Sequence, residues 1–246
     1  MPALGLSILV HGDSKVGKSR FGLSTPAPRL VLDAESGSRF VFGGIVSWDP
    51  RTSPPPQPDG TWETCHVPVH DYVTVTAALQ WLQSGQHPFS SVVIDSISEL
   101  QQRAVDSIAG TDQMKRENWG ELLRTVSETV RKFRDLTTHP TRPLYAVVYI
   151  AMTCKPENKW RPLVQGALKD FLPYYTDICG YLFMNPPSEP AGSWPGNRLL
   201  VMPHPDFVAG ERVGGIFGQV IESPNVTEMV RHVYATYAPQ TQQNGA

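Results

Sequence analysis

The segment at residues 12–19 has the composition and spacing of a phosphate-binding loop. Its pattern is GxxxxGKS, which ends in Lys18 and Ser19. Glycines let the backbone curl so that successive N–H groups point at a phosphate, while the lysine reaches the β- and γ-phosphates and the serine binds Mg²⁺. This P-loop pattern predicts a site for ATP or a related nucleotide with Mg²⁺. The predicted nucleotide contacts are Gly12, Asp13, Ser14, Lys15, Val16, Gly17, Lys18, Ser19 and Arg20.

Carboxylates follow two apolar segments farther along the chain. The strand expected at 30–32 runs into Asp33 and Glu35, and the strand expected at 91–94 runs into Asp95. A carboxylate in the position of Asp95 binds Mg²⁺ through water, and its alternative role is a simple strand-end cap. Hydrolysis needs a carboxylate that orients and deprotonates the attacking water. Glu35 is the predicted base, and Asp33 is the competing choice.

These side chains need a scaffold of buried strands. An apolar run at 6–10 precedes the P-loop, and helix-compatible residues follow it. Continuously apolar strands that alternate with amphipathic helices predict an α/β fold, with a mostly parallel central sheet flanked by helices on both faces. The other expected elements are a loop at 48–62, a helix from Asp71 to about Ser84, a helix after Asn118, a strand at 144–151, a late antiparallel hairpin at 178–184 and 199–202, and a helix from about Asn225.

Composition limits the remaining possibilities. The chain has 246 residues, 40% of them hydrophobic and 18% charged, which predicts one domain at 1–238 and a disordered Gln-rich tail at 239–246. A net charge of −2 gives no global basic field, so any nucleic-acid partner must meet a local patch. The three cysteines form no CxxC pair, and no apolar run is long enough for a bilayer. We therefore expect a cytoplasmic protein without a membrane partner.

Three segments together resemble one family. Residues 12–19, 31–35 and 92–96 are similar to the core of the RecA-like recombinase ATPases, above all to compact phage-encoded members associated with single-strand annealing and recombination. Only the first segment is specific alone, and the match extends to about Glu222. The resemblance implies a RecA-like fold, ATP and Mg²⁺ as cofactors, Glu35 as the water-activating residue and Asp95 as the Mg²⁺ partner. If the protein is phage-encoded, its compartment is the bacterial host cytoplasm.

The resemblance also implies two loops that bind single-stranded DNA. They correspond to residues 110–118 and 153–166. Cations beside an aromatic ring suit single strands, because phosphates attract cations and unstacked bases need a π-face. The alternative for the second loop is a solvated segment whose tryptophan folds back onto the domain. The DNA-binding side chains implied are Lys115, Arg116, Lys155, Lys159, Trp160 and Arg161.

Assembly and catalysis in trans follow from the same resemblance. Residues 166–169 are similar to a segment near the family's subunit interface, so a homo-oligomer is expected. Arg212 stands where family members supply a cation to the neighbouring subunit's nucleotide, although an exposed arginine without a catalytic role is the alternative. The family's amide before the second loop is replaced by Met152 and Thr153, which predicts slow or weakly coupled hydrolysis. Lys15 is an extra candidate phosphate contact.

Three functions remain open at this point. The leading hypothesis is a DNA-stimulated ATPase that binds single-stranded DNA in recombination, annealing or repair, with a single-strand-binding or replication protein as a further candidate partner. The alternative is a nucleotide-dependent scaffold or loader for a replication protein, with little direct DNA binding. A small-molecule kinase ranks last, because the sequence has no arginine-rich lid or separate acceptor domain.

Overall fold

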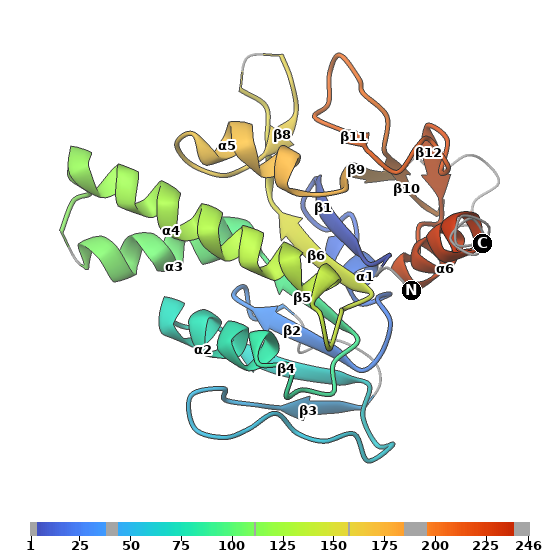
Figure 1. The fold of residues 1–246 in the computed structure, drawn as a ribbon. Helices are drawn as coiled ribbons and strands as arrows, with labels where there is room; N and C mark the ends of the chain where they lie inside the picture. The colour runs from blue at the N-terminus through green and yellow to red at the C-terminus, as the bar shows by residue number, and fades with distance from the viewer. Residues whose placement is uncertain (1–3, 38–43, 111, 157, 185–195, 239–246) are drawn as a thin grey trace.

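The computed structural model is built around one twisted sheet (Figure 1). The structure describes residues 4–37, 44–110, 112–156, 158–184 and 196–238. Within them the strand order is β12-β10-β9-β1-β6-β5-β2-β4-β3, and β11 pairs with β9. The strands are β1 (Leu6–Gly12), β2 (Arg29–Asp33), β3 (Ile45–Ser47), β4 (Thr64–Pro68), β5 (Ser91–Asp95), β6 (Ala146–Ala151), β9 (Ile178–Met184), β10 (Asn197–Leu200), β11 (Gly210–Glu211) and β12 (Val220–Glu222), with β7 (Thr153–Cys154) and β8 (Arg161–Pro162) in a separate antiparallel pair.

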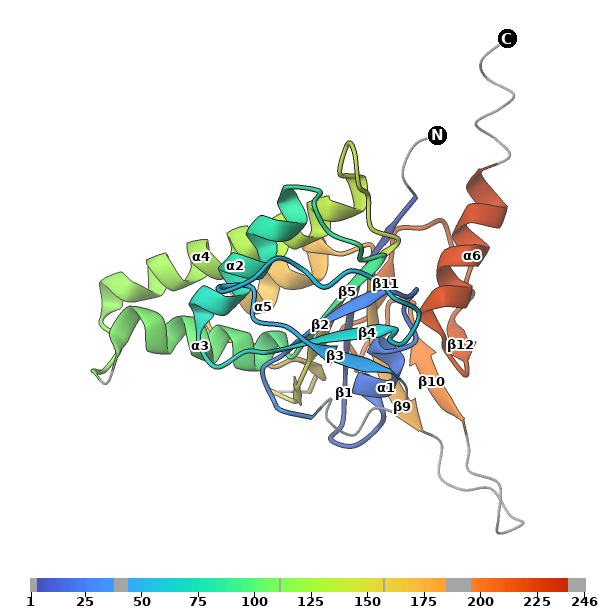
Figure 2. The same cartoon turned by 90° about the horizontal axis from the view of Figure 1, so that it is seen from below.

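Helices cover both faces of the sheet (Figure 2). Side chains along β1 alternate between two cores, so that Leu9 packs on one face while Ile8 and Val10 pack on the other. One core includes α2 (Tyr72–Gln83), α3 (Ile97–Ala109), α4 (Arg116–Asp135) and α5 (Leu168–Phe171), and the other includes α1 (Lys18–Gly22) and α6 (Val226–Tyr237). Short 3-10 helices follow α4 at Leu136–Thr138 and α5 at Leu172–Tyr175.

The register of the parallel strands brings distant carboxylates together. Asp33 at the end of β2 pairs directly with Asp95 at the end of β5. On the other side of β6, β1 runs parallel and ends at Gly12, where the P-loop begins. Because parallel strands end at one edge of a sheet, the P-loop and both carboxylates lie along the same edge.

The predicted fold class is confirmed, including the mostly parallel sheet and the late antiparallel hairpin of β9 and β10. Several short strands were not predicted. Polar residues such as Thr64 and His66 interrupt the apolar pattern of β4, and β3, β7, β8, β11 and β12 have only two or three residues each. The residues between β3 and β4 form no helix or strand from 48 to 62, yet Trp48 and Trp62 are buried. The expected disordered tail at 239–246 and most of the connection between β9 and β10 lie outside the described residues.

Two helices differ from their predicted form. The helix expected after Asn118 already begins at Arg116, and Lys115 precedes it without a side-chain cap. The helix after the P-loop has only five residues, Lys18 to Gly22, so its dipole contributes less than a long helix would. None of the described helices combines the length and the apolar character needed to cross a bilayer.

Candidate functional site

Two glycines in the P-loop are required by the surrounding backbone. A Cβ at Gly12 would lie 2.2 Å from the carbonyl oxygen of Leu182 on β9, so no larger residue fits there. Gly17 has a φ of 98°, in the left-handed region that favours glycine, and a Cβ there would lie 2.5 Å from Nδ2 of Asn197. Lys15 is exposed and has a φ of 66°. The loop therefore curls tightly between β1 and α1.

The two reactive side chains of the P-loop are held by hydrogen bonds. The amine of Lys18 donates to the carbonyl oxygens of Gly12 at 2.9 Å and Asp13 at 2.8 Å, which folds it over the loop. Burial lowers the pKa of Lys18, and the nearby carboxylates of Glu35 and Asp95 oppose that change. The hydroxyl of Ser19 donates to Oδ2 of Asp95 at 2.6 Å. A cation and a hydroxyl therefore stand beside a buried carboxylate.

Asp95 has the surroundings of a Mg²⁺ partner. The residue is 4% exposed, and burial raises its pKa to about 6, with Glu35 and Asp33 adding to the effect and Ser19 and Lys18 opposing it. Mg²⁺ is usually bound through one or two protein oxygens, with phosphates and water completing its shell. The paired oxygens of Ser19 and Asp95 fit that requirement. A cation bound there would favour the charged carboxylate and neutralise phosphate charge.

Glu35 and Asp33 have different environments, although both follow β2. Glu35 is exposed and accepts a short hydrogen bond from the hydroxyl of Ser96, directly after Asp95. The side chain of Asp33 is 1% exposed, lies 3.0 Å from Nε2 of His66, and accepts from the backbone N–H groups of Glu35 and Gly37. Asp33 thus shapes the turn that carries Glu35. This geometry favours Glu35 as the residue that contacts water.

Sequence reasoning missed the residues that support these carboxylates. Ser96 accepts from the N–H of Glu99 as the N-cap of α3 and also donates to Glu35. Its sequence signal was available, because a serine followed three residues later by glutamate is typical of a helix start. His66 gave no such signal, since only the pairing of β2 with β4 brings it to Asp33.

A buried histidine connects the P-loop strand to the β7–β8 hairpin. His11 is fully buried, with Nε2 2.8 Å from the carbonyl oxygen of Val208 and Nδ1 3.0 Å from Oγ1 of Thr153. Because a carbonyl only accepts, Nε2 carries the proton, while Nδ1 faces the hydroxyl of Thr153, which donates to the carbonyl oxygen of Arg161 at 3.1 Å. Burial lowers the pKa of His11 to about 4, consistent with this neutral form. His11, which directly precedes Gly12, therefore contacts both the β7–β8 hairpin and the segment before β11.

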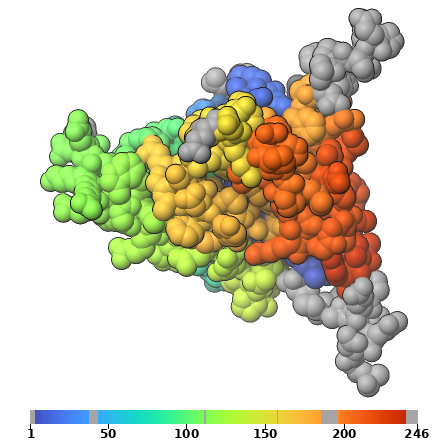
Figure 3. Space-filling model, turned by 90° about the horizontal axis from the view of Figure 1, so that it is seen from above, coloured from blue at the N-terminus to red at the C-terminus, as the bar shows by residue number. Residues whose placement is uncertain are grey.

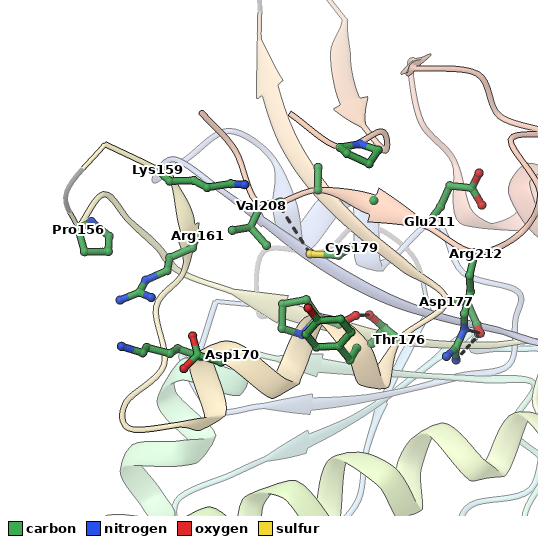
Figure 4. A pocket seen from close by; sticks show the side chains of 16 residues that line it. Pro156, Lys159, Arg161, Asp170, Thr176, Asp177, Cys179, Val208, Glu211 and Arg212 are labelled. Carbon is green, nitrogen blue, oxygen red and sulfur yellow. Dashed lines mark hydrogen bonds and ion pairs between the residues drawn. The ribbon is translucent and has the colours of Figure 1, made fainter. Parts of the chain in front are cut away.

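A cavity of about 810 Å³ lies beside the hairpin (Figures 3 and 4). It is bordered by β8, by α5 with its following 3-10 helix, and by the segment around β11. Lys159, Arg161 and Lys169 line it, and none of them forms an ion pair within the described residues, although the lining also includes Asp170, Asp177 and Glu211. Nε of Arg161 is buried without a hydrogen-bond partner in the same described part of the chain. We call this cavity the cationic groove.

Trp160 is partly integrated into the fold. Its backbone N–H donates to Asp206 at 2.7 Å, and its carbonyl accepts from Val208 at 2.8 Å. The ring is half-buried and forms a cation–π contact within its own hairpin, because Nζ of Lys155 lies 5.4 Å from the ring centroid. Trp160 is therefore anchored by its backbone to the segment before β11. This agrees with one part of the alternative interpretation, in which the tryptophan folds back onto the domain.

The structure separates the two predicted DNA loops. Lys115 and Arg116 are exposed at the tip of the α3–α4 hairpin, which projects away from β1 and the cationic groove (Figures 1 and 2). Arg116 belongs to the first turn of α4 instead of the predicted loop, and Thr111 and Glu157 lie outside the described residues. Lys159 and Arg161, by contrast, line one cavity.

Arg212 lies at the far end of the cationic groove from Lys159 and Arg161 (Figure 4). Its Nε and Nη2 atoms lie 2.8 Å and 2.7 Å from Oδ1 of Asp177, whose other oxygen accepts from Ser7 at the beginning of β1. Because Gly12 ends the same strand, Arg212 and the P-loop of its own chain lie at opposite ends of β1. Any contact of Arg212 with a nucleotide requires another subunit.

The site can be compared with known protein families. The model of a family described as AAA domain matches residues 4–213, which is most of the chain and includes the P-loop, both carboxylate segments and the cationic groove. No curated protein matches the chain significantly.

Proposed function

The chain belongs to the AAA domain family, and from this premise we propose that it hydrolyses ATP with Mg²⁺ and binds single-stranded DNA. Membership implies nucleotide binding and P-loop ATPase activity in general. The more specific proposal is a RecA-like protein of phage type that acts as a homo-oligomer in recombination, annealing or repair. In this account, ATP changes the protein's affinity for DNA.

One observation supports hydrolysis above all others, namely the hydrogen-bonded arrangement of Ser19 with Asp95 and of Ser96 with Glu35. In the proposed reaction, Lys18 leaves its backbone acceptors and binds the β- and γ-phosphates. Ser19 and Asp95 would hold Mg²⁺, and the ion would neutralise charge on the phosphates. Glu35 then takes a proton from the attacking water while Ser96 holds its carboxylate in place.

The cationic groove supports the DNA part of the proposal. Lys159, Arg161 and Lys169 have no carboxylate partner within the described residues, and a phosphate backbone would supply that charge. The nearby ring of Trp160 offers a surface for base stacking. Arg212 is proposed to act in trans, and its release from Asp177 would accompany assembly.

ATP hydrolysis measured without DNA, with single strands and with duplex, each at low and high salt, tests the proposal. We expect stimulation by single strands alone, and we expect it to decline at high salt because phosphate contacts release counterions. A scaffold or loader that contacts only protein would give the same rate in all these conditions. That result would overturn the DNA part and leave the ATPase intact.

A further inference from the structure

Tyr174 is the most exposed of the large hydrophobic side chains that the structure describes, at 79%. It lines the cationic groove, and no other aromatic side chain of the described residues does so. Trp160, by contrast, lies outside that lining, and its ring already has a cation–π contact with Lys155. The aromatic face available inside the groove is therefore that of Tyr174.

A short, rigid element presents this ring. Pro173 lies in the first turn of the 3-10 helix Leu172–Tyr175, and its own ring restricts the backbone there. Residues three apart share one side of a 3-10 helix, and here Leu172 is fully buried while Tyr175 packs against the same core. Tyr174 lies on a different side of the helix. Its exposure is thus imposed by the helix that carries it.

The ring of Tyr174 has no partner of its own. Within the described residues, its hydroxyl forms no hydrogen bond, and neither a cation nor a second ring packs on its face. The adjacent Tyr175 differs, because Cζ of Arg131 lies 5.9 Å from its ring centroid. A base that stacked on Tyr174 would therefore displace only water, and a tyrosine has few side-chain torsions to immobilise.

The groove is not uniformly cationic. Lys159 and Arg161 lie at one end of it, and Asp177 and Glu211 lie at the other (Figure 4). Tyr174 comes shortly before Asp177 in the chain, on the segment that leads to it. Phosphates are attracted to the cations and repelled by the carboxylates, whereas a base is neutral. The part of a strand that suits the surroundings of Tyr174 is therefore a base.

We propose that Tyr174 is the base-stacking residue of the cationic groove and that it makes the groove selective for unpaired bases. The inference rests on the proposed binding of single-stranded DNA. In a duplex, neighbouring pairs cover both faces of each base, so the tyrosine has no face to stack on, whereas a single strand can turn a base outward. The cations bind phosphates of either kind of strand, and the ring supplies the selectivity.

Two labelled strands of equal length separate these contributions. One is a thymine oligonucleotide, and the other consists of abasic sites, which keep the phosphates and have no bases. For Tyr174→Ala we expect the Kd for the thymine strand to rise about five- to hundredfold, the range of one stacked base, while the Kd for the abasic strand stays within about twofold. Tyr174→Phe keeps the ring and should bind both strands within about twofold of the unmodified protein. Phe171→Ala is the matched control, because Phe171 is an exposed aromatic residue of the neighbouring α5 that does not line the groove.

Three outcomes would overturn the assignment. Equal losses for both strands in Tyr174→Ala would mean that the tyrosine only supports the phosphate contacts, and an unchanged Kd for the thymine strand would mean that no base reaches it. A smaller mass of Tyr174→Ala in light scattering without DNA would place the residue in a contact between copies of the chain. If the unmodified protein binds neither strand at low salt, the proposed DNA binding itself fails, whatever the Tyr174 variants do.

Discussion

The P-loop edge of the sheet and the cationic groove are built in different ways. Along the P-loop edge, each side chain with proposed chemistry lies at the end of a buried strand or is hydrogen-bonded to one that does, as with Ser19 and Asp95. In the groove, Lys159 and Lys169 come from short or irregular segments and have no ion-pair partner within the described residues. The first region is held together by its own hydrogen bonds, whereas the second contains cations that no ion pair within the described residues neutralises.

His11 is the physical connection between these regions. It precedes Gly12 on β1, and its ring contacts Thr153 and Val208, which belong to the segments around the groove. A displacement of the P-loop on nucleotide binding would therefore be transmitted through one hydrogen bond to the β7–β8 hairpin and through another to the segment before β11. If the regions differ in this way and are coupled through His11, substitutions in each should have distinct effects.

The largest effect is expected for Glu35→Gln. This change removes the proposed base and keeps the size of the side chain, so the rate of phosphate release should fall about 10²- to 10⁴-fold with little change in nucleotide affinity. Asp33→Asn is the informative comparison, because Asp33 holds the turn through His66 and two backbone N–H groups. It should lower the free energy of unfolding by about 1.5–3 kcal/mol. If Glu35→Gln releases phosphate at the full rate, Glu35 is not the base.

Lys18→Ala should reduce nucleotide affinity about 10- to 100-fold, because it deletes a charged donor to the phosphates. Binding of a fluorescent ATP analogue measures the change. The matched control is Lys132→Ala, since Lys132 is an exposed residue on α4 that pairs with Glu128. Comparable loss in both variants would show that the measurement reports general charge instead of the P-loop.

The buried state of His11 predicts a pH dependence of stability. Its folded pKa of about 4 lies below the ordinary histidine value of 6.5, so the unfolded chain binds more protons between these two pH values and stability falls as pH decreases through them. At pH 5 the loss relative to pH 7 amounts to about 2 kcal/mol. Urea unfolding should show a smaller loss in His11→Gln. Burial also lowers the pKa of His87 to about 4. His87 is present in both the unmodified protein and His11→Gln, so its effect on the pH dependence of stability cancels when the two are compared.

Smaller effects are expected in the cationic groove. Lys159→Ala and Arg161→Ala should each weaken single-strand binding and reduce the slope of log K against log salt by about 0.7, the value for one phosphate contact on a single strand. Lys115→Ala, at the remote α3–α4 tip, should change the slope less if the groove is the principal path. The reverse order of effects would move the DNA site to the tip.

The two regions also differ in how far sequence could predict them. The P-loop, Glu35 and Asp95 could be proposed from sequence because local motifs at strand ends mark them. His66 and His11 were not, because their partners come from distant segments that only the sheet register and the loop before β11 bring near. The prediction that Lys115 and Arg116 bind DNA together with the second loop was made without the three-dimensional arrangement. Sequence order does not show that α3 and α4 project away from the groove.

The most direct test of the coupling is the affinity of a labelled single strand with and without a non-hydrolysable ATP analogue, measured by fluorescence anisotropy. We expect the analogue to change the Kd for DNA in the unmodified protein and to leave it unchanged in Lys18→Ala. If the Kd for DNA in the unmodified protein does not change when nucleotide binding is saturated, the nucleotide site and the DNA site are not coupled.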